Sequence, residues 1–283
     1  MNAVDLYNRM EIDFRLSTCR DDWSEMDFNE YVTDQYHKRY MGLVTDNTDT
    51  INYVYTAVFP SQNVIDKIIR SNRRKALLFV HHPMRWVMPK NPVFADIAIE
   101  SLKKLQEMEI SIYNLHVPLD ANGIYSTTYN LAEAVGINIT GEFSEYYGVQ
   151  VGVIGTTKCQ TIMQLKRCFE NAVKHEVKLY PYGESIIKDN KVALVAGGGN
   201  DAAEYPFLRE QGINTYLTGV TRIATSYQPS IDAHDAAKGN EVNILGGTHY
   251  STEKFACIKI VEYFSKLGIQ GEFIPDLPCM DDM

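Results

Sequence analysis

The sequence predicts an α/β protein in which parallel strands alternate with helices. Residues 76–80 form an unbroken apolar run, as expected for a strand that is buried on both faces of a sheet. A second run, 51–58, is rich in β-branched and aromatic residues, and residues 61–71 between the two runs carry apolar side chains at helical spacing. A strand, a helix and a strand in this order form a parallel pair with a right-handed crossover. The length of 283 residues fits one large unit or two lobes.

The composition is that of a folded protein without membrane spans. Hydrophobic residues make up 45% of the chain and charged residues 22%, which is close to the average for soluble domains. No apolar run approaches the ~20 residues that cross a bilayer. The first residues do not show the basic and then apolar pattern of a signal peptide. We therefore expect a cytoplasmic protein that has no membrane partner.

Charge and cysteine content argue against a nucleic-acid partner, although local basic patches are possible, and against disulfide bonds or thiolate metal ligands. The formal net charge of −9 argues against a broad basic face, so nucleic acid is not an expected partner. The five cysteines form no CxxC pair and are odd in number, which argues against a disulfide framework and against a zinc site made of thiolates. We expect free thiols.

The remaining elements follow from local patterns. The acidic stretch 20–28 is expected to form a short helix and loop with a solvated face. In the loop predicted over 84–92, Arg85 and Trp86 are candidates to hold a phosphate and to stack on a base, or else to pin the loop by packing. Further helices are expected over 94–108, 127–135, 161–175, 201–211 and from about 249 to 267, strands over 110–115, 149–155, 191–196, 213–217 and 242–245, and a loose tail over 275–283.

Residues 197–200, Gly-Gly-Gly-Asn, form a glycine-rich turn after a predicted strand. Such a turn either presents backbone N–H groups to an anion or allows another part of the chain to approach the backbone closely. Its spacing matches neither the dinucleotide fingerprint nor the P-loop, so close approach is the preferred interpretation.

Three of the predicted strands end in histidine, and two of these ends are followed by a carboxylate four residues after the histidine. The side chains concerned are His81, His82, His116, Asp120, His249 and Glu253. Ligands of open α/β sheets bind at the carboxyl ends of strands, where these side chains lie. Imidazole and carboxylate are standard ligands for zinc, manganese, iron and nickel. Of the other histidines, His37 is expected to be structural or exposed, His175 to have a structural role near the end of its helix, and His234 to lie on the surface.

Four imidazoles and two carboxylates are too many ligands for one four-coordinate ion, and they suit two. In two-metal sites the ions lie roughly 3.5–4 Å apart, carboxylates commonly bridge them, and a shared water or hydroxide completes each shell. The sequence therefore predicts two divalent metal ions, of zinc, manganese, iron or nickel, with a metal-bound water as the expected nucleophile.

Three motifs make the chain resemble the Nif-three-like family, whose members are also named GTP cyclohydrolase I type 2 homologues. These motifs are Val80-His81-His82-Pro83, the segment from His116 to Asp120 that continues as Asp120-Ala121-Asn122-Gly123, and Gly247-Thr248-His249-Tyr250-Ser251-Thr252-Glu253. The resemblance covers roughly residues 46–267, including the glycine turn at 197–199 and Tyr-Leu-Thr-Gly at 216–219.

The resemblance implies a two-lobed Nif-three-like fold, with mixed and parallel sheets flanked by helices and the metal site between the lobes at strand carboxyl ends. It places the two metal ions on the six side chains named above and implies a toroidal homohexamer. We expect a single unit over 1–283, with approximate lobes 1–141 and 142–283 and no inserted extra domain. Family members often have glutamate after the Thr-Gly pair, where this chain has Val220.

Two interpretations of the function follow. The first is a metal-dependent hydrolase, cyclohydrolase-like or phosphoesterase-like, that acts on a nucleotide or a related small phosphorylated or heterocyclic compound. The family name implies opening of the guanine ring of GTP. The second is a non-catalytic scaffold or adaptor whose metal ions hold lobes or subunits together. A pocket walled by Arg85 or Trp86 would favour the enzyme.

Overall fold

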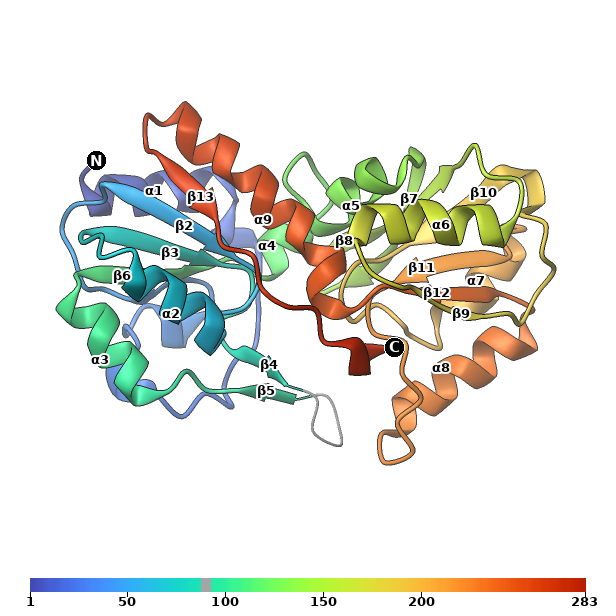
Figure 1. Cartoon of the computed structure of the whole chain (residues 1–283), viewed down its shortest axis with the longest axis horizontal. Coiled ribbons are helices and arrows are strands. Elements are labelled where there is room, and N and C mark those ends of the chain that lie inside the picture. The colour runs from blue at the N-terminus through green and yellow to red at the C-terminus, as the bar shows by residue number, and fades with distance from the viewer. Residues whose placement is uncertain (88–92) are drawn as a thin grey trace.

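The computed structural model of the chain describes residues 1–87 and 93–283 and has two lobes, each built around its own β-sheet (Figure 1). Within these residues, the first lobe contains a five-stranded sheet in the order β1-β6-β3-β2-β13, and the second a six-stranded sheet in the order β7-β8-β10-β11-β12-β9. The predicted two-lobed α/β fold is therefore confirmed. Residues 88–92 of the predicted loop lie outside the described residues.

The first sheet brings several strand ends to one edge. Strands β13, β2, β3 and β6 run parallel, and β1 pairs antiparallel with β6. Ala57 lies opposite Val80, and Val80 lies opposite Asn114, so β2, β3 and β6 end side by side. The strands are β1 (Gly42–Thr45), β2 (Tyr53–Ala57), β3 (Ala76–Val80), β6 (Ile110–Asn114) and β13 (Gly271–Phe273).

Helices cover both faces of the first sheet. Every residue of β3 is buried, as its apolar run predicts, and its side chains alternate between the faces. They pack with α1 and α9 on one face and with α2 and α3 on the other. These helices are α1 (Ala3–Asp13), α2 (Gln62–Arg70), α3 (Ile99–Glu107) and α9 (His249–Lys266).

The second sheet has a parallel centre, formed by β10, β11 and β12, with antiparallel strands on both sides. Helices α5 and α6 cover one face, and α7 and α8 cover the other. Its strands are β7 (Asn138–Tyr146), β8 (Val149–Thr156), β9 (Lys178–Tyr180), β10 (Lys191–Leu194), β11 (Thr215–Thr218) and β12 (Asn243–Gly246). The helices of this half are α5 (Thr127–Val135), α6 (Ile162–Val173), α7 (Glu204–Glu210) and α8 (Gln228–Gly239). The short helix α4 (Val117–Asp120), which follows β6, packs in the core of the first lobe.

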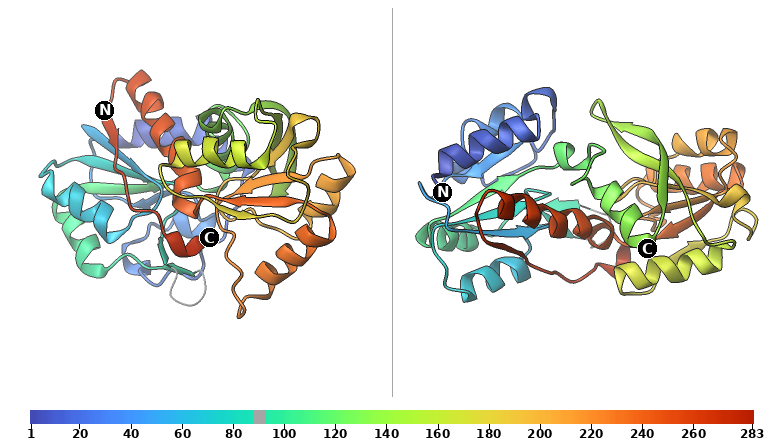
Figure 2. Two further views of the ribbon diagram at one scale, coloured as in Figure 1. Left: turned by 45° about the vertical axis from the view of Figure 1, so that its right-hand side comes forward. Right: turned by 90° about the horizontal axis from the view of Figure 1, so that it is seen from above.

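Helix α9 joins the two lobes. It begins just after β12 of the second sheet and packs against β2 and β13 of the first sheet, as Figure 2 shows. The chain then adds β13 to the first sheet beside β2. The last part of the chain therefore belongs to the first sheet, and the predicted lobe boundary at residue 141 falls inside β7.

A hairpin follows β3 in place of the expected loop. Strands β4 (Arg85–Val87) and β5 (Val93–Ala95) pair antiparallel, so the prediction of a loop over 84–92 is wrong for the described residues. The helix predicted over 94–108 is present as α3, but it begins only at Ile99. Trp86 and Phe94 lie opposite each other with ring centroids 5.1 Å apart, and such aromatic cross-strand pairs stabilise strands. Apart from the short helix expected over 20–28, the other predicted helices and strands are present, with ends shifted by a few residues.

His234 is buried, so its predicted surface position is wrong. Its side chain is 4% exposed, Nδ1 accepts from the Tyr182 hydroxyl at 3.0 Å, and Nε2 donates to the Thr221 carbonyl at 2.7 Å. The polar sequence of α8 does not reveal this burial, because the hydrogen-bond partners of the ring come from other segments of the chain. His37 is exposed, as expected, and His175 lies 2.8 Å from the Ser251 hydroxyl.

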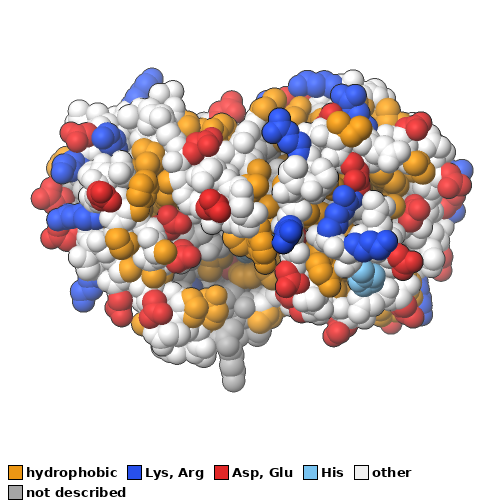
Figure 3. Space-filling model, turned by 180° about the vertical axis from the view of Figure 1, so that it is seen from behind, with side chains coloured by type: hydrophobic (Ala, Val, Ile, Leu, Met, Phe, Trp, Pro, Cys, Tyr) orange, Lys and Arg blue, Asp and Glu red, His pale blue; other side chains and the backbone are white. Residues whose placement is uncertain are grey.

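From behind, the surface is hollowed between the two lobes, and hydrophobic side chains form the floor of the hollow (Figure 3). Acidic and basic side chains are interspersed over this face. Within the described parts of the chain, every helix is too short or too polar to cross a membrane.

Candidate metal centre

The three strand ends meet at the junction of the lobes. β3 and β6 deliver their side chains from the first sheet, and β12 of the second sheet leads into α9, which carries the third group. Ligand atoms lie within 4.8 Å of one another in three overlapping sets: His81, His82 and His116; His82, His249 and Glu253; and His81, Asp120 and Glu253. The structure thus brings all six predicted side chains together.

His81 and His82 are positioned by the end of β3. Their backbone N–H groups donate to carbonyls at and just after the end of β2, at 3.1 and 3.0 Å, so strand pairing continues through them. His81 Nδ1 donates to the Leu115 carbonyl at 3.0 Å. Because a carbonyl can only accept, Nδ1 carries a proton, and Nε2 is the nitrogen that faces Asp120 Oδ1, at 3.3 Å.

His116 is oriented by Asp21, a residue 95 positions earlier in the chain. Its Nδ1 lies 2.9 Å from Asp21 Oδ2, and its Nε2 lies 3.6 Å from Asp120 Oδ2. A carboxylate on one ring nitrogen fixes the tautomer and leaves the other nitrogen as a ligand. Asp21 also accepts from the Trp23 indole N–H at 2.8 Å, and its side chain is 2% exposed.

The acidic stretch 20–28 is therefore not a solvated helix and loop, and that prediction is wrong. It has no helical segment, and Trp23, Met26 and Phe28 are buried. The Trp23 ring packs edge-on against His82 and His116, with centroids 5.8 and 5.1 Å away. Sequence reasoning missed Asp21 because its carboxylate has no metal-type spacing with a nearby histidine; the apolar residues that alternate with the acids were the available signal.

Glu253 lies among three imidazoles at the start of α9. Its Oε1 is 3.1 Å from His249 Nε2 and 3.5 Å from His81 Nε2, and its Oε2 is 3.0 Å from His82 Nε2. Thr248 caps the helix by accepting from the Ser251 N–H at 3.2 Å. The spacing of four residues places His249 and Glu253 on one helix face, as the sequence predicts.

The glycine-rich turn touches this carboxylate. Gly197 has φ +69°, and a Cβ added there would lie 2.1 Å from Glu253 Oε1. Its N–H donates to the Thr252 hydroxyl at 2.9 Å. Close backbone approach, the preferred interpretation of this turn, is therefore what Gly197 provides.

Asp120, at the end of α4, lies among the imidazoles as Glu253 does. Its Oδ1 accepts from the Thr127 hydroxyl at 2.8 Å and faces His81, while its Oδ2 faces His116. Its side chain is 15% exposed, the most open of the carboxylates in the cluster. Each carboxylate therefore lies between histidines.

Burial and charge oppose each other in this cluster. Burial by itself lowers the pKa of His81, yet the carboxylates of Asp120 and Glu253 raise that pKa well above 6.5. Burial holds the pKa of His82 well below its usual value. Burial raises the pKa of Glu253, but His249 and the other two histidines lower it well below its usual value. Glu253 is thus negative, the state that binds a cation.

Three imidazole nitrogens in the cluster have no hydrogen-bond partner among the described residues. They are Nε2 of His81 and Nδ1 of His82 and of His249, all buried. A buried polar atom without a partner costs about 1–3 kcal/mol. A cation that takes up such lone pairs removes this cost. The nitrogen and oxygen donors present therefore fit a divalent metal ion of the first transition row.

Arg85 and Trp86 have different positions. Arg85 Nε donates to the Asp96 carbonyl at 2.5 Å, and the residue is not among the described residues that line the central cavity. The Trp86 ring lies on the cavity wall, with its centroid 4.5 Å from that of His249. The structure thus places Trp86 at the site, while the Arg85 contact fits the packing role that was the alternative.

The C-terminal tail is also part of the site, and the prediction of a loose tail is wrong. Asp282 is fully buried, and its carboxylate accepts from the Trp86 indole N–H and from the backbone N–H of His249, both at 2.8 Å. Its carbonyl accepts from the N–H groups of Thr221 and Arg222 at 2.7 and 2.9 Å. A carboxylate at a helix N-terminus is favoured by the unpaired N–H groups there.

The cluster opens into a cavity of about 430 Å³ between the lobes. Its wall includes five of the six predicted donors, His82, His116, Asp120, His249 and Glu253. Trp86, Phe94 and Tyr146 form an aromatic part of the same wall. The donors are therefore accessible to a small molecule although they are almost completely buried.

Comparisons with known proteins agree with this architecture. Curated relatives named GTP cyclohydrolase 1 type 2 homolog include a Borreliella burgdorferi protein, 26% identical over 261 residues, which covers 91% of this chain and 93% of the relative. Another, from Pyrococcus horikoshii, is 25% identical over 237 residues and covers 82% of this chain and 88% of the relative.

Solved structures show the same fold. The protein ybgI, of unknown function, superposes with a TM-score of 0.76 at 20% identity, covering 99% of this chain and 100% of that one. Reduced HcgD from Methanocaldococcus jannaschii superposes with a TM-score of 0.67 at 22% identity and covers 98% of both chains. The sequence model of the family described as Duf34/NIF3 (NGG1p interacting factor 3) matches residues 32–275. Because this match spans most of the chain, the protein belongs to the Duf34/NIF3 family.

Proposed function

We propose that this protein is a dinuclear-metal hydrolase that acts on a nucleotide or a related small phosphorylated or heterocyclic compound. The observation that carries the proposal is the exposure of five donor side chains to a cavity large enough for such a compound. A purely structural metal site is closed, whereas a catalytic one keeps a side open to substrate. The name of the relatives refers to GTP cyclohydrolase, and guanine nucleotides belong to the class proposed.

The chain's own groups would hold two ions, each of zinc, manganese, iron or nickel. Each carboxylate lies between imidazoles, Glu253 at 3.1 Å from His249 and 3.0 Å from His82, and Asp120 at 3.3 Å from His81 and 3.6 Å from His116. Carboxylates placed in this way would hold the ions together with the neighbouring imidazoles. When bound, divalent ions acidify water and polarise the bond that is attacked. Asp21 would keep the His116 ring oriented, and the aromatic wall would limit the entry of bulk water.

A second candidate function is a non-catalytic scaffold, because the donors come from both lobes. His81, His82, His116 and Asp120 follow strands of the first sheet, whereas His249 and Glu253 follow a strand of the second. Metal ions held by both groups would tie the lobes together and stabilise the fold.

We also propose that the chain forms a toroidal homohexamer, as the family resemblance implies. Sedimentation equilibrium is expected to give the mass of six chains of 32.2 kDa each. A monomer or dimer at micromolar concentration would contradict this assembly.

Metal analysis tests the centre. Protein purified without added metal is expected to contain close to two ions per chain by inductively coupled plasma mass spectrometry. The His82→Ala and Glu253→Ala variants are expected to lose this metal, whereas His37→Ala, which changes an exposed histidine, is expected to retain it. Less than one ion per chain in the wild type, or metal retained in both donor variants, would refute the centre.

A hydrolysis screen of nucleotides and phosphoesters then separates enzyme from scaffold. The Asp120→Asn variant is expected to lose turnover while its assembly state stays that of the wild type. Collapse of the assembly in this variant, with no turnover of any compound by the metal-loaded wild type, would favour the scaffold.

A further inference from the structure

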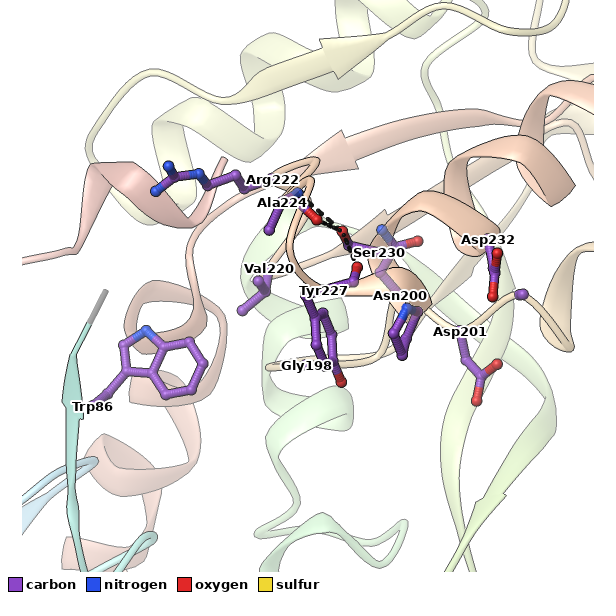
Figure 4. A pocket seen from close by; sticks show the side chains of 12 residues that line it. Trp86, Gly198, Asn200, Asp201, Val220, Arg222, Ala224, Tyr227, Ser230 and Asp232 are labelled. Atoms are coloured by element: carbon purple, nitrogen blue, oxygen red, sulfur yellow. Dashed lines mark hydrogen bonds between the residues drawn. The ribbon is translucent and has the colours of Figure 1, made fainter. Parts of the chain in front are cut away.

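A second cavity, of about 370 Å³, adjoins the metal cavity. The two share four wall residues, Trp86, Gly198, Asp201 and Tyr227. A molecule that reaches the metal donors can therefore extend into the second cavity, which we call the outer cavity. Figure 4 shows the outer cavity with Trp86 on one side of Val220 and Tyr227 on the other.

The outer cavity has two aromatic walls. The Trp86 ring is fixed in position by the hydrogen bond from its indole N–H to the buried Asp282 carboxylate at 2.8 Å and by packing against His249. The Tyr227 side chain is 46% exposed, and no ring contact involves it among the described residues. Exposed aromatic faces on a cavity wall are platforms for planar heteroaromatic rings, which stack on them regardless of ring identity.

The polar part of this wall consists mainly of hydrogen-bond acceptors. Asn200, Asp201 and Asp232 lie beyond Tyr227 in Figure 4, and Arg222 lies at the Trp86 side. One carboxylate oxygen of Asp201 accepts from the Ala203 N–H and one of Asp232 accepts from the Gln228 side chain, so each has a second oxygen that these bonds do not use.

With two divalent ions bound, the metal centre itself and the outer cavity would differ in the sign of their charge, although Glu145 and Glu204 also line the metal cavity. Among the described residues, Arg222 is the one cationic side chain on the outer wall, against two carboxylates. This balance suits a ring that carries amino groups and disfavours a polyphosphate. The metal centre, with two divalent ions and two carboxylates, would be positive and would attract the phosphate.

We propose, on the basis of the hydrolase function above, that the outer cavity binds the amino-bearing heteroaromatic base of a nucleotide while the phosphate faces the metal centre. In this orientation the reaction is hydrolysis of the phosphoester. A water oxygen forms a bond to phosphorus, the phosphorus–oxygen bond to the sugar breaks, and the proton of the water passes to the leaving sugar oxygen. The products are a nucleoside and inorganic phosphate. Ring opening of the base would require the reverse orientation, with the base at the metal centre.

Binding of 2-aminopurine riboside tests the outer cavity independently of catalysis, because this nucleoside is fluorescent and is quenched when it stacks. Quenching is expected in full-length protein from which metal has been removed by a chelator. Trp86→Phe and Tyr227→Leu are each expected to weaken binding, the latter by roughly tenfold, as loss of one stacking partner does. Tyr53→Leu is the matched aromatic control. Tyr53 is the first residue of β2, at the end of that strand away from the metal centre, so this variant is expected to bind the nucleoside as the wild type does. Absence of quenching, or equal binding by Tyr227→Leu and Tyr53→Leu, overturns the proposal.

The orientation is tested with the 5′-monophosphate of the same nucleoside. The monophosphate is expected to bind more tightly than the nucleoside to protein loaded with Mn²⁺, but not to metal-free protein. Arg222→Ala is expected to show the same increase in affinity for the monophosphate when loaded with Mn²⁺. A gain that persists without metal and disappears in Arg222→Ala places the phosphate in the outer cavity and overturns the proposed orientation.

The two proposals fail in different ways. Protein that binds metal and hydrolyses phosphoesters but does not quench the nucleoside retains the hydrolase function and loses the base site. Protein that quenches the nucleoside but holds no metal loses both the hydrolase function and the orientation.

Discussion

Replacement of Gly197 by alanine is expected to push the Glu253 carboxylate out of the metal centre while the fold stays intact. The new Cβ would lie 2.1 Å from Glu253 Oε1, and ordinary contact begins at 3.4 Å, so the oxygen must retreat by about 1.3 Å. Metal–ligand distances tolerate deviations of about 0.2 Å. The displacement is several times larger than this tolerance, and Glu253 faces three of the four histidines in the cluster.

The backbone cost of this substitution is smaller than its effect on the metal. Gly197 has φ +69°, where alanine costs about 1–2 kcal/mol. Total stabilities are about 5–15 kcal/mol, so the variant is expected to fold. Removal of a residue that hydrogen-bonds to a metal ligand lowers metal affinity by about 10- to 100-fold. Displacement of the ligand itself, here Glu253, is expected to lower the metal affinity by more than this.

Two glycine variants serve as controls. Gly198→Ala meets no atom within 4 Å, and Gly136→Ala combines φ +81° with open space, so it carries the backbone cost without the clash. Metal content by mass spectrometry and thermal unfolding by circular dichroism are measured on all three. Gly197→Ala with the metal content and affinity of the wild type would refute the role assigned to this glycine.

Three further predictions concern groups around the donors or remote from them. Asp21→Asn removes the charge that orients a buried imidazole, so metal affinity in a chelator competition is expected to fall by about 10- to 100-fold, whereas the exposed Asp22→Asn should not change it. Asp282→Ala leaves the buried backbone N–H of His249 without an acceptor and removes the acceptor of the Trp86 indole N–H. The free energy of unfolding in urea is expected to fall by about 1–3 kcal/mol, with the exposed Asp281→Ala as control. Burial lowers the pKa of His234 below 6.5. As the pH falls below 6.5, the unfolded chain therefore takes up a proton that the folded chain does not, and the free energy of unfolding decreases. His234→Gln is expected to reduce this decrease, measured by urea titrations at several pH values.

Each of these has a contradicting result. Equal metal affinity of the variants at positions 21 and 22 would contradict the orienting role of the first carboxylate. Equal stability of Asp281→Ala and Asp282→Ala would show that Asp282 does not hold the tail in place. The same pH dependence in the wild type and in His234→Gln would show that this histidine does not contribute to acid destabilisation.

The strands, most helices and the six donor side chains could be predicted because each depends on a short stretch of chain. An apolar run of five residues defines β3, and the histidines follow where the run stops. Parallel pairing then places neighbouring strand ends at one edge, as the register of Val80 opposite Asn114 shows. The spacing of four residues likewise places His249 and Glu253 on one helix face.

Only the tertiary structure decided which carboxylates outside the six donors belong to the site. Asp21 and Asp282 both lie in acidic stretches that predict solvated segments, yet one meets a histidine 95 residues away and the other meets the backbone of His249, 33 residues away. Local patterns report the average exposure of a residue type, whereas burial of a charge depends on whether a distant donor is there to receive it. The sequence by itself therefore determined the strands and the six candidate donors at their ends, while the packing of the N-terminal segment, α9 and the tail around them decided the groups that orient these side chains and enclose the cavity.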